Sequence, residues 1–283
     1  MTIEQYPQSV SNKDIGSLPA DFPTLSGTVL DLFLLKGKAA VITGGARGIG
    51  YAIAEAYSEA GVSYLGIMDY SDNRTALEEL QDKFPKTKVQ FWSCDVRSLE
   101  QVGQVVTDIR HTFGSIDIFV ANAGIAWTAG PLIDQPDDRE WKNVFDIDVD
   151  GVYQCAKHVG RVFRDQGSGS MVMTASMSAH IVNVPQLQAG YNAAKAAVLQ
   201  LGKSLAIEWA PFARVNTVSP GYIATELSDF VSDNYKNIWY SLIPKGRQGL
   251  ARELVGAYLY LASDASTYTT GTDLRVDGGY TSI

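Results

Sequence analysis

The sequence predicts an α/β fold in which a doubly wound parallel sheet is covered by helices on both faces. Short apolar strands alternate with longer helical stretches from Lys38 onward, which is typical of strand–helix–strand units. The strands are apolar along most of their length, as expected where neither face of a sheet meets water. A glycine-rich turn directly after the first strand indicates a nucleotide site at the carboxyl edge of this sheet.

Each strand and helix is recognised by its apolar pattern and its length. Strands are expected at 39–43, 64–68, 89–92, 116–121, 170–174, 214–219 and 273–276. Helices are expected at 50–60, 99–112, 141–164, 191–209 and 252–261. Because each helix is long enough for a crossover connection, all seven strands should be parallel.

The chain divides into an N-terminal arm and one domain. Residues 1–36 contain Pro7, Pro19 and Pro23 but no sustained apolar period, so they are expected to run over the surface. No linker rich in proline or glycine interrupts residues 37–283, which we therefore interpret as a single domain.

Composition argues against several classes of partner. The net charge is -8 and no run of Lys and Arg is present, so neither nucleic acid nor a membrane is an expected partner. No signal peptide and no run of about 18 apolar residues is found, and we expect a cytoplasmic protein. Cys94 and Cys155 match neither a disulfide framework nor a zinc site, and no metal is expected.

The glycine-rich turn has the composition of a site for the phosphates of a dinucleotide. Glycine lets the backbone bend tightly and approach a pyrophosphate, and the following helix start offers free N–H groups and a positive dipole end. We expect the coenzyme to contact Gly44, Arg47, Gly48, Ile49 and Gly50.

Charged residues at the turn and at the second strand end bear on which coenzyme binds. Asp69 ends that strand about 20 residues after Gly50, where a carboxylate would bind the ribose hydroxyls of NAD and repel the extra phosphate of NADP. Arg47 argues for NADP, because a guanidinium can pair with that phosphate. Asp69 also fits an ordinary solvated turn. NAD(H) is the favoured prediction, and NADP(H) stays open.

Two later strand ends bring polar groups to the same edge. Asp95 and Val96 follow the third strand, where they are expected beside the adenine. Asn122 and Gly124 follow the fourth strand, where their backbone should pass the ribose. Simple turn chemistry is the alternative for both strand ends.

Tyr191 and Lys195 are four residues apart at the start of a predicted helix, so they share one face. A nearby ammonium favours the phenolate and lowers the pKa of a tyrosine, which could then exchange a proton with a carbonyl or hydroxyl oxygen. Ser176 follows the fifth strand and could hydrogen-bond that oxygen. Ser178 competes for this role, and Ser176 is preferred because it lies directly at the strand end.

These motifs together resemble the short-chain dehydrogenase/reductase family over residues 36–283. The motifs are the glycine turn, Asn122-Ala123-Gly124, the serine, the Tyr191 and Lys195 pair, Pro220-Gly221 and Asp277-Gly278-Gly279. The resemblance implies a Rossmann fold and a homotetramer or homodimer. It also implies that Ser176 positions the substrate oxygen, that Tyr191 is the acid/base, and that Lys195 binds the nicotinamide ribose and lowers the pKa of Tyr191.

The resemblance adds further site residues and one departure. Pro220, Ile223 and Thr225 resemble a second coenzyme clamp. Asp148 stands where many members have an asparagine that holds a proton-relay water, and a carboxylate can accept from that water but cannot donate to it. The usual family spacing to the tyrosine points to Ser178, whereas the longer loop of similar fungal enzymes favours Ser176.

Within the family, the chain is similar to yeast and fungal carbonyl reductases and to sorbose- and mannitol-type reductases. That implies interconversion of a secondary alcohol and a ketone, either a polyol/ketose pair (sorbose, mannitol/fructose, arabinitol or xylulose) or a prochiral ketone. The alternatives are a reductase of 3-oxoacyl or steroid substrates and a non-catalytic dinucleotide sensor. A segment at 227–245 could close over the substrate or simply pack by its aromatic residues. Met177, His180 and Gln186 are candidate pocket residues, although a lone histidine is more often structural.

Overall fold

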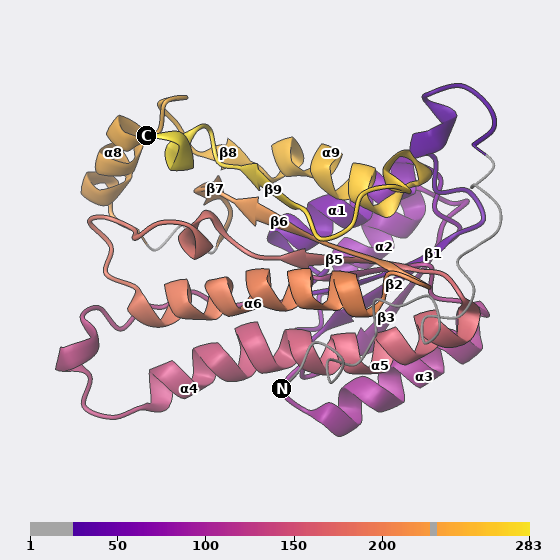
Figure 1. Ribbon diagram of the computed structural model, residues 1–283, viewed down its shortest axis with the longest axis horizontal. Coiled ribbons are helices and arrows are strands. Elements are labelled where there is room, and N and C mark those ends of the chain that lie inside the picture. Colours follow the sequence, from indigo (N-terminus) through magenta and orange to yellow (C-terminus); the bar gives the residue numbers. More distant parts are fainter. Residues whose placement is uncertain (1–24, 227–230) are drawn as a thin grey trace, which may run out of the picture.

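The computed structural model describes residues 25–226 and 231–283, and its centre is one parallel sheet (Figure 1). The sheet has seven strands in the order β3-β2-β1-β4-β5-β6-β9, all paired in parallel. Their bounds are β1 Ala39–Thr43, β2 Tyr64–Asp69, β3 Lys88–Ser93, β4 Ile118–Ala121, β5 Ser170–Thr174, β6 Arg214–Pro220 and β9 Asp273–Val276. The predicted seven-stranded, doubly wound Rossmann-type sheet is confirmed.

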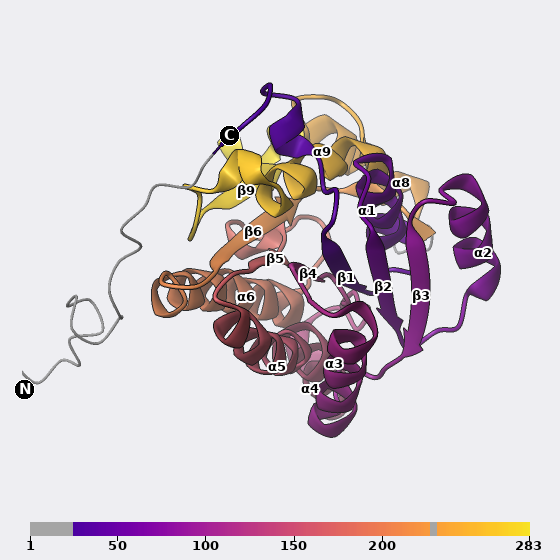
Figure 2. The same ribbon diagram turned by 90° about the vertical axis from the view of Figure 1, so that its right-hand side faces the viewer.

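Helices cover both faces of the sheet, as Figure 2 shows. One face carries α1 Gly48–Glu59, α2 Arg74–Lys83 and α9 Ala251–Ala262. The other face carries α3 Leu99–Phe113, α5 Gly151–Gln166 and α6 Ala189–Glu208. Side chains of successive strand residues point to opposite faces of the sheet. In β1, Val41 packs into the core under α3 and α5, whereas Ala40 and Ile42 pack into the core under α1 and α9.

The long helix predicted at 141–164 is interrupted. It consists of α4 Arg139–Phe145, a π-helical turn at Asp146–Asp150, and α5. A π-turn adds a residue to the helical ladder and changes which side chains face inward. Within this turn Asp148 is fully buried, which an uninterrupted amphipathic helix would not predict.

One helix, α2, was not predicted, and a second, α8 Asp233–Leu242, lies in the segment for which a pair of helices packing by aromatic residues was the alternative. Helix α2 is mostly polar, and its buried side chains are only Leu77 and Leu80, so its apolar period is weak. Helix α8 follows the undescribed residues 227–230 and buries Trp239. The predicted closing segment at 227–245 therefore lies partly outside the described residues, and whether it closes stays a prediction.

The predicted N-terminal arm also lies largely outside the described residues, which begin at residue 25. A short 3-10 helix at Asp31–Phe33 leads to Leu35, whose side chain is fully buried and whose N–H donates to the carbonyl of Ala60 at 2.9 Å. Across residues 25–226 and 231–283, no helix combines the length and apolar character needed to cross a membrane.

The end of the chain packs against the carboxyl edge of the sheet. Strands β7 Ile223–Ala224 and β8 Gly249–Leu250 form a small second sheet there. The Asp277 carboxylate accepts hydrogen bonds from the N–H of Gly279 at 2.9 Å and from the hydroxyl of Thr281 at 2.6 Å. A Cβ on Gly221 would lie 2.6 Å from the Cα of Asp277, so only glycine allows this close approach. The C-terminal turn thereby supports one wall of the site described next.

Candidate active site

A cavity of about 480 Å³ opens at the carboxyl ends of the strands, around the point between β1 and β4 where the strand order reverses. Ligands of open parallel sheets bind at such a point. The cavity brings together all the predicted site residues except Gly50. These are Gly44, Arg47, Gly48, Ile49, Asp69, Asp95, Val96, Asn122, Gly124, Asp148, Ser176, Tyr191, Lys195, Pro220, Ile223 and Thr225.

The glycine turn closes tightly on itself before α1 begins. Gly44 and Gly48 have φ values of 63° and 55°, in the left-handed region that favours glycine. Gly50 does not line the cavity, and its contact with the coenzyme stays a prediction. Instead, a Cβ at Gly50 would lie 2.1 Å from the carbonyl oxygen of Gly44, and its absence lets α1 start directly against the turn.

Asp69 is engaged with the backbone rather than free. Its two carboxylate oxygens accept from the N–H of Ala46 at 3.1 Å and from the N–H of Ser71 at 3.0 Å. Asn73, which the sequence analysis did not single out, donates to the carbonyl of Ala46 at 3.0 Å. Asp69 and Asn73 thus fix the glycine turn to the end of β2.

Asp95 and Asn122 are also held by the protein itself. Arg97 forms a bidentate ion pair with Asp95, and this hydrogen-bonded pairing holds the pKa of Asp95 below its ordinary value. The side-chain amide of Asn122 donates to the carbonyls of Thr43 and Gly44, both at 3.2 Å. The backbone N–H of Asn122 donates to the hydroxyl of Thr43 at 2.9 Å, and its side-chain oxygen accepts from the hydroxyl of Thr174 at 3.2 Å, so Asn122 joins β4 to the glycine turn and to β5.

Ser176, Tyr191 and Lys195 lie together on the opposite wall of the cavity. The Nζ of Lys195 lies 5.4 Å from the centre of the Tyr191 ring and donates to the carbonyl of Thr174 at 3.2 Å. Ser176 favours the ionised form of the Tyr191 phenol and so acts to lower its pKa. The Oγ of Ser178 instead accepts from the side chain of Gln188 at 3.2 Å.

Lys195 forms a buried ion pair with Asp148. The Nζ to Oδ2 distance is 3.0 Å, and both side chains are almost wholly buried. The other carboxylate oxygen of Asp148 accepts from the N–H of Ile125 at 2.9 Å. A Cβ on Gly124 would come within 3.1 Å of Asp148 and 3.3 Å of Lys195, so this glycine lets the backbone pass over the pair.

Burial and charge set the pKa values of this group. Burial raises the pKa of Asp148 despite the opposing effects of Lys195 and of the Ile125 N–H. Burial alone would lower the pKa of Lys195, but the charges of Asp148 and Tyr191 outweigh it and the pKa is raised. Lys195 therefore stays protonated, with Asp148 as its counter-charge.

Lys195 was expected to lower the pKa of Tyr191. It does act in that direction, but burial of the phenol outweighs it and the negative charge of Asp148 adds to the rise. The pKa of Tyr191 is consequently above its ordinary value. The sequence pattern showed the neighbouring ammonium but not the desolvation of the phenol or the carboxylate behind it.

Helix α6 is positioned at its first turn by a close contact. A Cβ on Gly190 would lie 2.4 Å from the indole ring of Trp127, which is itself buried in a cluster with Val144 and Ala194. Tyr191 packs against this cluster. The glycine next to the tyrosine thus allows the indole to fix where the phenol lies.

The wall beyond Ser176 is lined by amide and aromatic side chains. Met177 and Gln186 line the cavity as predicted, whereas His180 does not. Asn183, Tyr222 and Trp239 line the cavity as well, and of these Tyr222 lies within the expected coenzyme clamp and Trp239 within the segment at 227–245. The rings of Tyr222 and Trp239 stack with centroids 3.9 Å apart, and the Asn183 amide donates to the Tyr222 hydroxyl at 3.1 Å.

The chemistry of the cavity fits a nicotinamide dinucleotide. The glycine turn leads directly into the N-terminus of α1, whose N-cap residue Arg47 makes no side-chain cap hydrogen bond, and Gly44, Arg47, Gly48 and Ile49 line the cavity there. The wall with Tyr191 and Lys195 lies across the same cavity. One end therefore suits phosphates, and the other suits a proton-exchanging reaction.

Comparison with known proteins agrees with this geometry. A family model described as "Enoyl-(Acyl carrier protein) reductase" matches residues 44–281. A probable NADP-dependent mannitol dehydrogenase of Yarrowia lipolytica is 54% identical, with 93% of this chain and 94% of the relative covered. A sorbose reductase of Candida albicans is 52% identical, with 96% and 97% covered. The chain belongs to the short-chain dehydrogenase/reductase family.

A solved structure supports the same conclusion. The NADPH-dependent 3-quinuclidinone reductase of Rhodotorula rubra superimposes with a TM-score of 0.88 at 40% identity, covering 94% of this chain and 99% of that one. As a short-chain dehydrogenase/reductase, the protein is an NAD(P)-dependent oxidoreductase that interconverts a secondary alcohol and a carbonyl compound.

The close approach of Gly50 to the carbonyl of Gly44 predicts the effect of Gly50→Ala. The added Cβ would meet the carbonyl oxygen of Gly44, so the glycine turn must open, and we expect coenzyme affinity to fall at least tenfold, roughly the cost of one misplaced contact. Coenzyme binding is measured by the fluorescence of reduced nicotinamide. Gly256→Ala is the control, because its Cβ meets nothing within 4 Å. Equal affinity in Gly50→Ala and in the unaltered protein would contradict this account.

Proposed function

We propose that the protein interconverts a polyol and a ketose, with Tyr191 as the acid/base. The observation that carries the proposal is the buried assembly of Tyr191, Lys195 and Asp148, which shares one cavity with Ser176 and the glycine turn. An assembly of this kind can move a proton at one end of the cavity while a dinucleotide is held at the other.

The proposed roles follow from the contacts. When bound, the coenzyme supplies or accepts the hydride. The Oγ of Ser176 accepts from the N–H of Ser178 at 3.1 Å, and its hydroxyl is proposed to donate to the substrate oxygen. The Tyr191 phenol gives a proton to that oxygen during reduction and takes one from it during oxidation. The fixed charge of Lys195 stabilises the phenolate left after reduction.

Asp148 is proposed to hold Lys195 in place as its counter-ion, rather than to replace the asparagine of other family members in holding a relay water. A carboxylate that balances a buried ammonium removes the cost of an unpaired buried charge. The same negative charge works against the phenolate of Tyr191, which raises the pKa at which the tyrosine becomes a base.

The substrate class is proposed from the relatives and from the cavity wall. The relatives reported above are named for mannitol and sorbose. Beyond Ser176 the wall carries the amides of Asn183, Gln186 and Gln188, which suit the several hydroxyl groups of a sugar better than a plain hydrocarbon. The coenzyme would be held by Gly44, Gly48, Ile49 and the N-terminus of α1, with the Ile223 segment opposite.

For the coenzyme we propose NADP(H), contrary to the preference for NAD(H) expected from Asp69. Both oxygens of Asp69 already accept from backbone N–H groups, so this carboxylate has a structural role in holding the glycine turn that does not depend on a ribose. Arg47 lines the same end of the cavity, and its guanidinium is 60% exposed. The mannitol dehydrogenase and quinuclidinone reductase relatives are both named for NADP or NADPH.

Two further expectations remain proposals. We propose a homotetramer or homodimer that resides in the cytoplasm, as the family resemblance implies. The outer faces of α5 and α6 form a groove that includes Tyr153, Leu205 and Phe212, and this groove is a suitable surface for a second copy.

The substrate proposal is tested by a panel of reductions. NADH and NADPH are crossed with fructose, sorbose, xylulose, an aryl ketone and a 3-oxoacyl thioester, and loss of reduced nicotinamide absorbance is followed. We expect the ketoses with NADPH to give the highest kcat/KM. The Tyr191→Phe variant should lose about 10²- to 10⁴-fold in kcat, because it lacks the proton. Preference for the thioester, or full activity of Tyr191→Phe, would refute the proposal.

The negative charge of Asp148 predicts that the pH profile of alcohol oxidation is shifted in Asp148→Asn. Asparagine keeps an oxygen for the Ile125 N–H but removes the negative charge that raises the pKa of Tyr191. Alcohol oxidation needs the phenolate and rises with pH, so we expect this rise to move toward acid. Asp150→Asn, at an exposed position of the same π-turn, should leave the profile in place. A shift toward alkali would contradict the assignment.

The coenzyme proposal predicts an effect of Glu226→Gln. The Glu226 carboxylate pairs with Arg47 at 3.1 Å, and both side chains are largely exposed, so the pair is weak and competes with a 2′-phosphate for the guanidinium. We expect the KM for NADPH to fall about two- to fivefold relative to that for NADH. Asp138→Asn, which breaks the exposed pair with Lys142 away from the cavity, is the control. An unchanged ratio of the two KM values would count against Arg47 as the phosphate contact.

A further inference from the structure

His180 lies outside the cavity but is joined to the segment that carries Ser176. The carbonyl of Ser176 accepts from the N–H of Ala179 at 3.0 Å, and the carbonyl of Met177 accepts from the N–H of His180 at 2.9 Å. The Oγ of Ser176 also accepts from the N–H of Ser178. Residues 176–180 therefore form one hydrogen-bonded turn, with the serine at its start and the histidine at its end.

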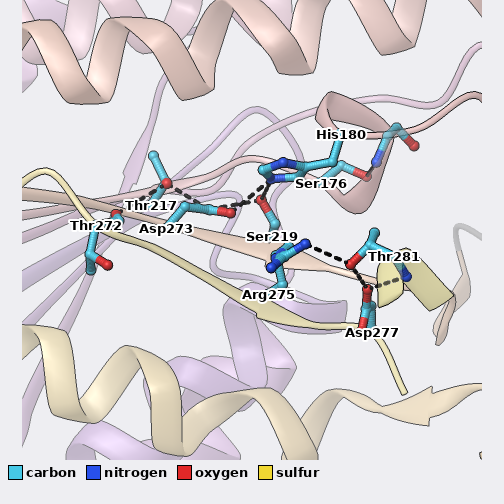
Figure 3. Close-up of polar contacts among 10 residues, drawn as sticks. Ser176, His180, Thr217, Ser219, Thr272, Asp273, Arg275, Asp277 and Thr281 are labelled. Atoms are coloured by element: carbon cyan, nitrogen blue, oxygen red, sulfur yellow. Dashed lines mark hydrogen bonds and ion pairs between the residues drawn. The ribbon is translucent and has the colours of Figure 1, made fainter. Parts of the chain in front are cut away.

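The imidazole reaches across β6 to the edge strand β9 (Figure 3). The Nε2 of His180 lies 2.9 Å from Oδ2 of Asp273, the first residue of β9. Because a carboxylate only accepts, this Nε2 carries a hydrogen. The exposed fractions of the two side chains are 24% and 9%, so the pair is shielded from water far more than an ordinary surface pair.

Asp273 is itself held by the neighbouring strand β6. Its Oδ1 accepts from the hydroxyl of Thr217 at 2.6 Å and from the hydroxyl of Ser219 at 2.8 Å (Figure 3). Both donors belong to β6 and are buried. Ser219 lies 3.4 Å from the imidazole, but it is fully buried and donates to Asp273, so these three residues do not form a nucleophile and its base.

We propose that His180 and Asp273 are positioning residues for the Ser176 turn and for the cavity wall that follows it. The wall segment 181–188 is fixed at its far end by Gln188, which donates to Ser178, and in its middle by the Asn183 bond to Tyr222. The bond from His180 to Asp273 ties the turn to the edge strand of the sheet, outside the cavity. It sets where the Ser176 hydroxyl meets the substrate oxygen.

The proposal rests on the role of Ser176 proposed above, and it predicts a specific kinetic pattern. In His180→Ala the turn loses its outer attachment, and kcat for carbonyl reduction should fall about 10- to 100-fold, the cost of displacing a reacting group by about 1 Å. The KM for coenzyme should not change, because the glycine turn lies on the other side of the cavity. His180→Gln, whose amide can still donate to Asp273, should recover most of kcat.

The experiment compares His180→Ala, His180→Gln, Asp273→Asn and the double variant His180→Ala/Asp273→Asn. If the two residues act as one pair, the double variant should lose no more in kcat than His180→Ala. His111→Ala, at an exposed histidine in the last turn of α3, is the matched control and should behave as the unaltered protein. Any carbonyl compound that the unaltered protein reduces can serve, so failure of the ketoses as substrates leaves this test intact.

Amide hydrogen exchange gives a readout that needs no substrate. The N–H groups of Ala179 and His180 should lose protection in His180→Ala and regain it in His180→Gln, while those of the buried central strand β1 stay protected. Unchanged kcat in His180→Ala would overturn the proposal. Equal losses of kcat in the Ala and Gln variants, or losses matched by coenzyme affinity, would also overturn it, because they would indicate general damage to the fold.

Discussion

The buried ion pair between Lys195 and Asp148 is the interaction on which the arrangement of the site depends. Placing two charges away from water costs several kcal/mol for each ion, and the cost is recovered only where geometry and additional hydrogen bonds are good. Here the Thr174 carbonyl serves the ammonium, and the Ile125 N–H serves the carboxylate. Helix α6, the π-turn and the ends of β4 and β5 must all be in place for the pair to be stable.

Close packing around this ion pair and around Tyr191 requires glycine at two backbone positions. Gly124 passes within van der Waals distance of both charged groups, and Gly190 accepts the indole of Trp127 just before Tyr191. A Cβ at either position would displace a residue that fixes the phenol or its ammonium. Close backbone approach, rather than turn conformation, is what glycine provides at these two positions.

Many polar residues around the cavity form hydrogen bonds or ion pairs within the protein itself. Asp69 and Asn73 hold the glycine turn, Arg97 holds Asp95, and Asn122 ties β4 to β1. Outside the cavity, the Asp273 carboxylate accepts hydrogen bonds from Thr217, Ser219 and His180. Such satisfied networks keep the cavity walls rigid, and a rigid wall presents Ser176 and Tyr191 in one geometry.

The sequence by itself determined the sheet, the parallel direction of its strands and the residues that lie at its carboxyl edge. Apolar strands of the right length, crossover helices and glycine turns are local signals, and β1, β5 and β9 have the bounds that these signals predict. The π-turn, the burial of Asp148, the raised pKa of Tyr191 and the attachment of His180 to Asp273 were decided only by the tertiary structure. Each depends on residues far apart in the chain, and desolvation is a property of the assembled site that no sequence spacing contains.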